Sequence, residues 1–499
     1  MYPKFSSLSC FSNVDPRVFV VLSFFVPSFV RVLPEVLMGK YIVGFDTISY
    51  YIPVALRWVN DGVGFFEFIA CAPLFYVLLV QLGFLGVPFA ISLKILPPIL
   101  LGCLGLVVFV YARKVLAWSS EKSLGVSCLA TLYFVALRIS WDMLRNELGL
   151  ILLFVFLILL HINLINDRWK HRFLLLPVML LVVLSHQLVA VIMFAVIFAW
   201  VLRKMVANEH GVAKRLVLCS LPAALLFALT VYASFVISLD LSVLSGFPGR
   251  DSGGWFSLFG FSSYLDMVAC MLGFFVYCYL PLLPFMLVGI RQFKNVELRG
   301  WFCWCLVGAL SSFSSPYTFL LGGYRWTLML VFPVAFFVVE GLGRLNSTSW
   351  RLVFSGVLIL LSFSFALLPV NVAFPYFRFF PYHVPSSMLQ NSVPLSDCDD
   401  VVDALSWVGN KVGTNGVLLV HDTFHGWALM FLDREKVACY GYGDPEETAR
   451  KMFGDGYNRL YVVWWVPGEG WHGVSMLPSC FVEVFRSNRI AVYEYNSAV

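Results

Sequence analysis

The sequence contains few charged residues. Only 13% of its 499 residues are charged, whereas 60% are hydrophobic and 17% are aromatic. Soluble globular domains carry about 25% charged residues. Because a soluble fold could not bury this much apolar surface, the composition predicts an integral membrane protein.

Several motifs of soluble enzymes are also missing. The sequence has no phosphate-binding Walker loop and no Gly-x-Ser-x-Gly motif, and its 12 cysteines form no pairs at zinc-site spacing. The net charge is +5, but Lys and Arg occur in short runs between apolar stretches and form no single basic patch. These absences argue against nucleotide-driven cytosolic chemistry and against nucleic acid as a partner.

The first apolar stretch has no convincing signal-peptide cleavage site, so we expect it to remain as the first helix. A helix needs about 20 residues to cross a hydrocarbon core of about 30 Å, or fewer where short helices meet inside the protein. About eleven apolar segments meet this requirement: 18–38, 92–112, 123–138, 147–165, 173–184, 188–202, 216–236, 267–290, 301–314, 326–342 and 352–373.

The charges between these segments predict their orientation. Basic runs occur at 113–122, 168–172, 203–215, 291–299 and 344–351. The positive-inside rule places these runs in the cytoplasm. A further apolar segment, 70–89, would invert this order if it crossed the membrane, so we expect an amphipathic or re-entrant segment at the outer surface. Eleven spans from a cytoplasmic start leave the C-terminus outside.

The composition changes after the last apolar segment. Residues 1–374 are predicted to form the transmembrane module, 375–394 a linker and 395–499 a globular domain. Helical patterns cover 399–408 and 444–453, and strand patterns cover 416–420, 460–465, 481–485 and 490–495. The predicted fold is therefore a polytopic α-helical membrane protein with a small extracytoplasmic α/β domain at its C-terminus.

Polar residues collect in the predicted outer loops, and ionisable groups at membrane depth are candidates for function because they are costly there. In the first outer loop, Asp46 precedes Tyr50 and Tyr51. Asp46 could act as a general base toward an acceptor hydroxyl or amine if a pocket raises its pKa. The alternative is that Asp46 is a helix N-cap. The two tyrosines are expected to contact substrate.

The second outer loop carries Arg138, Asp142, Arg145 and Glu147. Both arginines could bind phosphate oxygens through two parallel hydrogen bonds, and Asp142 could orient them or the acceptor. Glu147 is expected to contact substrate. The alternative is a cluster of internal salt bridges at two helix ends.

Two further outer positions are candidates. His186 lies where two short apolar segments meet and could bind a phosphate or a sugar hydroxyl, or it could cap freed backbone groups. Tyr324 and Arg325 precede the tenth segment and are expected to bind the phosphate of an anionic lipid headgroup, although Arg325 could instead be an interfacial anchor. The loop at 246–255 could close over a site or be an ordinary connection.

Together these features resemble the GT-C superfamily of membrane glycosyltransferases, which includes protein O-mannosyltransferases and aminoarabinose transferases. The residues that carry the resemblance are 44–47 with Tyr50 and Tyr51, 72–76, 138–147, 185–186 and 324–325. The resemblance implies a lipid-linked sugar donor, carried on polyprenyl or dolichyl phosphate, and a protein, lipid or glycan acceptor at the outer face of a prokaryotic cell membrane. It assigns Asp46 as the base, Asp142 as the second-loop acid and Arg325 as the cation near the donor phosphate.

The sequence also departs from the family. Asp46 lacks the acidic neighbour that O-mannosyltransferases have, because Thr47 follows it. No acidic metal triad is present, so the sequence neither requires nor excludes a divalent cation as cofactor. Two rivals to a transferase are a transporter or lipid flippase and an inactive scaffold. Transporters place charged sites near the membrane midplane, whereas these residues lie at the outer ends of the helices, which favours an enzyme.

Overall fold

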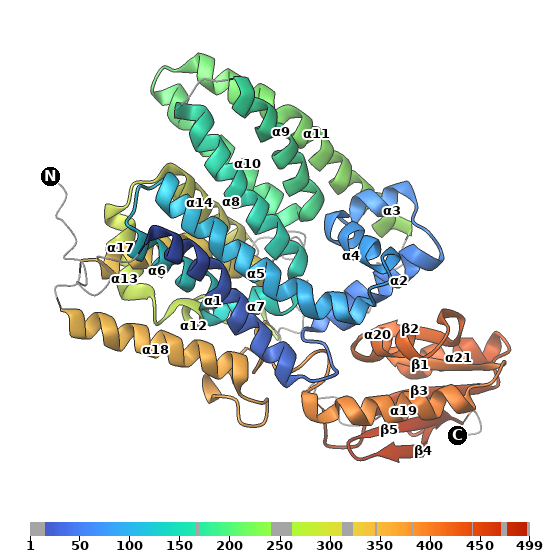
Figure 1. The fold of residues 1–499 in the computed structure, drawn as a ribbon. Coiled ribbons are helices and arrows are strands. Elements are labelled where there is room, and N and C mark those ends of the chain that lie inside the picture. Colours follow the sequence, from blue (N-terminus) through green and yellow to red (C-terminus); the bar gives the residue numbers. More distant parts are fainter. Residues whose placement is uncertain are drawn as a thin grey trace.

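The structure of the protein is a computed structural model that describes residues 15–165, 169–240, 262–311, 323–344, 347–380, 383–441, 443–470 and 477–496. The predicted loop at 246–255 lies outside these ranges. The chain forms a bundle of helices followed by a small domain that contains a β-sheet (Figure 1).

Within the described residues, seven helical stretches are long and apolar enough to cross a membrane. They are α1 (Pro16–Leu37), α5 (Phe89–Lys114), α8 (Leu144–Ile165), α10 (Gln187–Val206), α11 (His210–Asp240), α16 (Tyr324–Met329) with α17 (Val331–Leu342), and α18 (Thr348–Leu367). This arrangement confirms the prediction of a polytopic helical membrane protein.

Two helix pairs raise the number of spans to nine if each bent pair crosses once. The pair α6 (Ser120–Leu132) and α7 (Phe134–Asp142) bends by 56°, and the pair α12 (Tyr264–Tyr279) and α13 (Leu283–Gln292) bends by 83°. The remaining two predicted segments overlap the shorter helices α9 (Trp169–Ser185) and α14 (Val296–Ser311).

The segment predicted to lie at the membrane surface is broken into short helices. After η2 (Thr47–Tyr51) and α2 (Ile52–Asn60), the chain forms α3 (Phe65–Ala70) and α4 (Leu74–Phe84). At 11 residues, α4 is about half the length needed to span a bilayer. These short helices lie between the bundle and the C-terminal domain (Figure 1).

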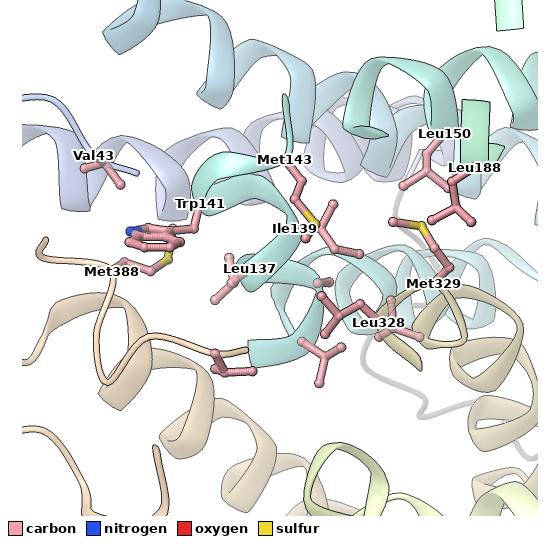
Figure 2. Packing of buried hydrophobic residues seen from close by; sticks show 14 of the residues in the cluster. Val43, Leu137, Ile139, Trp141, Met143, Leu150, Leu188, Leu328, Met329 and Met388 are labelled. Atoms are coloured by element: carbon pink, nitrogen blue, oxygen red, sulfur yellow. The ribbon is translucent and has the colours of Figure 1, made fainter. Parts of the chain in front are cut away.

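Helix α7 occupies the centre of the bundle, and all of its residues are buried. It is separated from α6 by Tyr133, whose extended backbone ends the preceding helix and whose hydroxyl donates to the carbonyl oxygen of Cys278 at 2.7 Å. Figure 2 shows Ile139 and Met143 of this region among Leu328 and Met329. Because α7 is enclosed on all sides, polar groups at its C-terminal end must find partners inside the protein.

The C-terminal domain is a five-stranded sheet in the order β2-β1-β3-β5-β4. Strand β1 is parallel to β2 and β3, whereas β5 is antiparallel to β3 and β4. The elements are α19 (Cys398–Lys411), β1 (Gly416–His421), α20 (Asp422–Phe431), β2 (Val437–Gly441), α21 (Pro445–Gly454), β3 (Arg459–Trp465), β4 (Phe481–Ser487) and β5 (Ile490–Tyr495). The predicted helices and strands are confirmed, while α20 and β2 were not predicted.

This domain packs closely on the loop that follows α1. In α20, a Cβ atom added to Gly426 would lie 1.8 Å from the carbonyl oxygen of Ile48 in η2. Lys40 forms an ion pair of 2.8 Å with Asp399, and Arg434 forms one with Asp61. The domain is therefore held against the membrane module at several points.

We expect Gly426→Ala to destabilise this contact by about 1–3 kcal/mol, because the added methyl group overpacks the interface. Thermal unfolding in lipid nanodiscs and limited proteolysis of the linker would measure the effect. Gly454→Ala in α21 is the control, because a Cβ there meets nothing within 4 Å. Equal melting temperatures for the two variants would contradict the prediction.

Candidate active site

The loop between α1 and η2 makes a turn that only glycine fits well. Gly44 has a φ of +102°, and a Cβ atom on it would lie 2.2 Å from the carbonyl oxygen of Trp141. Its amide donates to the carbonyl oxygen of Gln390 at 3.1 Å. The loop is thereby fixed over the end of α7, with Asp46 directly before η2.

Asp46 is the carboxylate at the centre of the site. It precedes η2, but its side chain makes no capping hydrogen bond. Within the described part of the chain it also forms no ion pair at salt-bridge distance. Burial raises the pKa of Asp46 above its usual value, and the nearby charges of Arg325, Arg138 and Arg145 oppose the rise. A half-buried carboxylate that has a raised pKa and no ion-pair partner among the described residues has the properties of a general base.

Asp46 opens into a cleft of about 980 Å³ between the membrane module and the C-terminal domain. Tyr50, which is 41% exposed, lies on the same wall. The polar residues that line the cleft are Asp46, Ser49, Tyr50, Arg57, Asn60 and Asp61 from the membrane module, and Asp422, His425, Asp433, Arg434 and Glu435 from the C-terminal domain. The cleft is large enough for a substrate of several sugar or peptide units, since ligand pockets measure about 300–1,000 Å³.

Arg138 and Asp142 form a buried ion pair on successive turns of α7. Their side chains are 5% and 3% exposed, and Arg138 also donates through Nε to the carbonyl oxygen of His383 at 2.7 Å. The alternative of an internal salt bridge is therefore confirmed for this pair. Asp142 is bound to a cation, in contrast to Asp46.

Arg145 and Arg325 form no salt bridge with a carboxylate within the residues that the structure describes. The guanidinium of Arg145 lies 5.5 Å from the ring centroid of Tyr76, and its Nε is buried without a hydrogen-bond partner. Arg325 is half-buried in the first turn of α16 and interacts electrostatically with Asp46 and Asp142. Two cations beside Asp46 thus keep hydrogen-bonding capacity for an anion.

The tyrosine that precedes Arg325 is held by a stacked ring. The ring of Tyr324 lies 4.5 Å from that of His383, with an angle of 18° between the planes. The turn before α16 depends on Gly323, whose φ is +41°. Tyr324 and Arg325 therefore start this helix in a fixed orientation.

His186 caps a helix in the structure. Its Nδ1 accepts a hydrogen bond from the amide of Leu188 at 3.1 Å, in the first turn of α10, and lies 3.4 Å from Nδ2 of Asn146. The capping alternative is confirmed, while binding of substrate through the other ring nitrogen stays a prediction.

Tyr51 and Glu147 lie beneath the cleft and do not line it. Tyr51 is 3% exposed and packs on Phe75, with 5.1 Å between ring centroids. Glu147 is fully buried, and Arg31, whose charge acts on it, forms a 2.9 Å ion pair with Glu35. The structure brings neither residue to the cleft, so their contact with substrate stays a prediction.

Two parts of the site were not predicted. One is the wall contributed by the C-terminal domain, which includes His425 and Asp433. The other is the linker, whose Gln390 carbonyl accepts hydrogen bonds from Gly44 and, at 3.0 Å, from Nε1 of Trp141. Figure 2 shows Trp141 pointing toward Met388 of the linker. Among the described residues, no group of three or more His, Cys, Asp or Glu could hold a metal ion.

The comparisons with known proteins concern the fold. No family model matches the chain, and no curated protein sequence does either. Among solved structures, ArnT from Cupriavidus metallidurans in the apo state is similar over 96% of this chain and 97% of its own, with a TM-score of 0.52. The fold resembles that of ArnT. At 14% sequence identity the likeness to ArnT concerns the fold alone, and it agrees with a polytopic helical membrane architecture.

We expect Asp142→Asn to destabilise the protein by about 3–5 kcal/mol, because it leaves the charge of Arg138 buried and unpaired. The double variant Arg138→Met with Asp142→Leu removes both charges, so it should be more stable than Asp142→Asn. Unfolding followed by tryptophan fluorescence in nanodiscs would rank the three proteins. A double variant less stable than Asp142→Asn would contradict this account.

Proposed function

We propose that this protein is a membrane glycosyltransferase of the GT-C type that transfers a sugar from a polyprenyl- or dolichyl-phosphate carrier to an acceptor at the outer face of the membrane. The observation that carries the proposal is Asp46, an unpaired carboxylate with a raised pKa that opens into a substrate-sized cleft. The charges of Arg145 and Arg325 act on Asp46, and neither arginine forms a salt bridge with a carboxylate among the described residues. A base next to an anion site is what transfer from a phosphate-linked sugar requires.

The donor fits the cation side of this site. A polyprenyl chain partitions into the bilayer, so its phosphate reaches the site at the level of the helix ends. Arg145 and Arg325 would bind the phosphate oxygens, with Tyr324 beside them. Fixed positive groups stabilise the negative charge that develops on the leaving phosphate, and they do so without reorganising during the reaction.

The acceptor fits the cleft side. As Asp46 removes the proton of an acceptor hydroxyl or amine, the acceptor oxygen or nitrogen forms a bond to the anomeric carbon. The bond between that carbon and the phosphate oxygen breaks, and its electron pair leaves with the phosphate. Asp46 is suited to this step because a raised pKa makes its ionised carboxylate a stronger base toward the proton of the acceptor.

We also infer that the site and the C-terminal domain face away from the cytoplasm. The basic runs at 113–122, 203–215 and 291–299 lie in the loops that the positive-inside rule assigns to the cytoplasm. An odd number of spans from a cytoplasmic N-terminus then places the C-terminal domain outside. A prokaryotic cell membrane is the expected location.

The test is sugar transfer by the purified protein in nanodiscs, using a panel of radiolabelled polyprenyl-phosphate sugars. Asp46→Asn should reduce turnover by about 100-fold or more, because general-base catalysis contributes factors of about 10²–10⁴. Asp455→Asn, an exposed position at the end of α21, is the matched control and should retain full turnover.

Other outcomes of this test identify the rival functions. If the protein consumes no donor but moves the labelled lipid across the bilayer, it is a flippase and not a transferase. Equal turnover by wild type and Asp46→Asn would remove Asp46 as the base.

The pH dependence gives a second test. Because only the ionised form of Asp46 accepts a proton, kcat/KM should be constant above its raised pKa and should fall as the pH drops through it. Arg325→Met removes a charge that lowers this pKa, so the acidic limb of the profile should move to higher pH. A limb that stays in place or moves to lower pH would contradict the assignment.

A further inference from the structure

The linker between α18 and α19 runs through the site. One end accepts hydrogen bonds from Gly44 and Trp141 at the carbonyl oxygen of Gln390. Next to it, Ser392 accepts a hydrogen bond of 3.1 Å from Nε1 of Trp427 in α20. The same segment also contacts Arg138, because the carbonyl oxygen of His383 accepts a hydrogen bond from it. The linker thus contacts the loop of Asp46, the end of α7, α16 and the C-terminal domain.

His383 contacts two residues of the candidate site, Arg138 and Tyr324. Its carbonyl oxygen accepts the 2.7 Å hydrogen bond from Nε of Arg138. Its ring stacks face to face on Tyr324 and packs with its edge toward Phe274, with 5.0 Å between ring centroids. The imidazole is therefore enclosed between two aromatic rings that come from different helices.

These contacts bear on two cations. Arg138 is close enough to Asp46 to affect it electrostatically, but its guanidinium is bound to Asp142 and to the carbonyl of His383. This arrangement keeps Arg138 from pairing with Asp46. On the other side, the stacked Tyr324 fixes the first turn of α16, where the next residue is Arg325.

We propose that His383 is a positioning residue for the donor phosphate: its ring orients the Tyr324–Arg325 turn and its carbonyl holds Arg138. This inference rests on the proposed function, because it assigns the donor phosphate to these cations. It gives the linker a role in donor binding in addition to its role as a connection between domains.

The surroundings of the His383 ring indicate that it acts through stacking on Tyr324. Burial and the charge of Arg138 lower the pKa of His383 to about 4, so the imidazole is uncharged at neutral pH. Within the described residues, neither ring nitrogen makes a hydrogen bond. A phenyl ring should therefore replace the imidazole, and a methyl group should not.

The experiment measures donor and acceptor kinetics separately in nanodiscs. His383→Ala should raise the KM for the polyprenyl-phosphate sugar about tenfold and leave the KM for the acceptor unchanged, because only the phosphate-binding geometry is loosened. His383→Phe should stay within about twofold of wild type for both constants. Thermal unfolding of each variant shows whether it is folded.

Phe380→Ala is the matched control. Phe380 lies on the same linker, and its ring packs on Phe274 and Tyr277 at 5.4 and 5.2 Å. Among the described residues its ring makes no aromatic contact with Tyr324 and no hydrogen bond with Arg138, and its carbonyl oxygen, which accepts from the amide of His383, is kept in Phe380→Ala. If the loss of any aromatic ring from the linker were enough to weaken donor binding, Phe380→Ala would raise the donor KM as well. An equal increase in Phe380→Ala and His383→Ala, or no increase in His383→Ala, would overturn the inference. An equal increase of the donor KM in His383→Phe and His383→Ala would show that the imidazole itself is required and that stacking is not sufficient.

A binding measurement separates this inference from the proposed function. Farnesyl phosphate, which carries no sugar, is titrated into wild type and the same variants by calorimetry. His383→Ala should weaken its binding about tenfold, whereas His383→Phe and Phe380→Ala should not. If the variants bind farnesyl phosphate in this pattern but wild type transfers no sugar, the proposed transferase activity is wrong and the positioning role of His383 is kept. Equal affinities for all variants would overturn the positioning role even where sugar is transferred.

Discussion

The burial of charge at one end of the helix bundle is the constraint on which this structure depends. Taking an ion out of water costs several kcal/mol unless it finds a partner. Arg138 and Asp142 meet this constraint within α7, with the carbonyl of His383 as a third partner. Because that pair is satisfied internally, Arg138 forms no ion pair with Asp46, and neither does any other cation in the described part of the chain. Arg145 and Arg325 form no salt bridge with a carboxylate in the described residues either, which is why the proposed function assigns the donor phosphate to them. One buried ion pair thus determines which charges of the cluster can act on a ligand.

The main features of the fold could be predicted because they follow from local patterns. Apolar runs of about 20 residues identify membrane helices. Asp444 followed by Pro445 marks the start of α21, where the Asp444 side chain accepts a hydrogen bond of 2.8 Å from the backbone amide of Glu446. The breaks inside spans could not be predicted in this way. The chain bends at Tyr133 without a proline or glycine, and the bend depends on packing with a distant helix. Strand β2 was missed because its residues are only partly buried and give a weak alternating pattern.

The candidate site was predictable to the extent that its charges are rare. An acid or an arginine at membrane depth is conspicuous in so apolar a chain, so Asp46, Arg138, Asp142, Arg145 and Arg325 could be selected from the sequence, and the structure brings them within electrostatic reach of one another. The partners of each charge depend on contacts between distant residues. Arg138 bonds to a carbonyl 245 residues away, on a segment with no local signature. For the same reason the sequence could not show that His186 caps α10 or that Tyr51 is covered by aromatic rings.

The close contact of Gly426 with Ile48 has a consequence for how such proteins can diversify. A soluble domain joined by a free tether can be exchanged for another without disturbing the rest of the chain. Here the exchange would also remove the surface against which η2 rests and would shift the linker that borders the cations. The two parts of the chain must therefore change together, and a chimera that takes its C-terminal domain from a relative needs the matching linker and first loop from the same source.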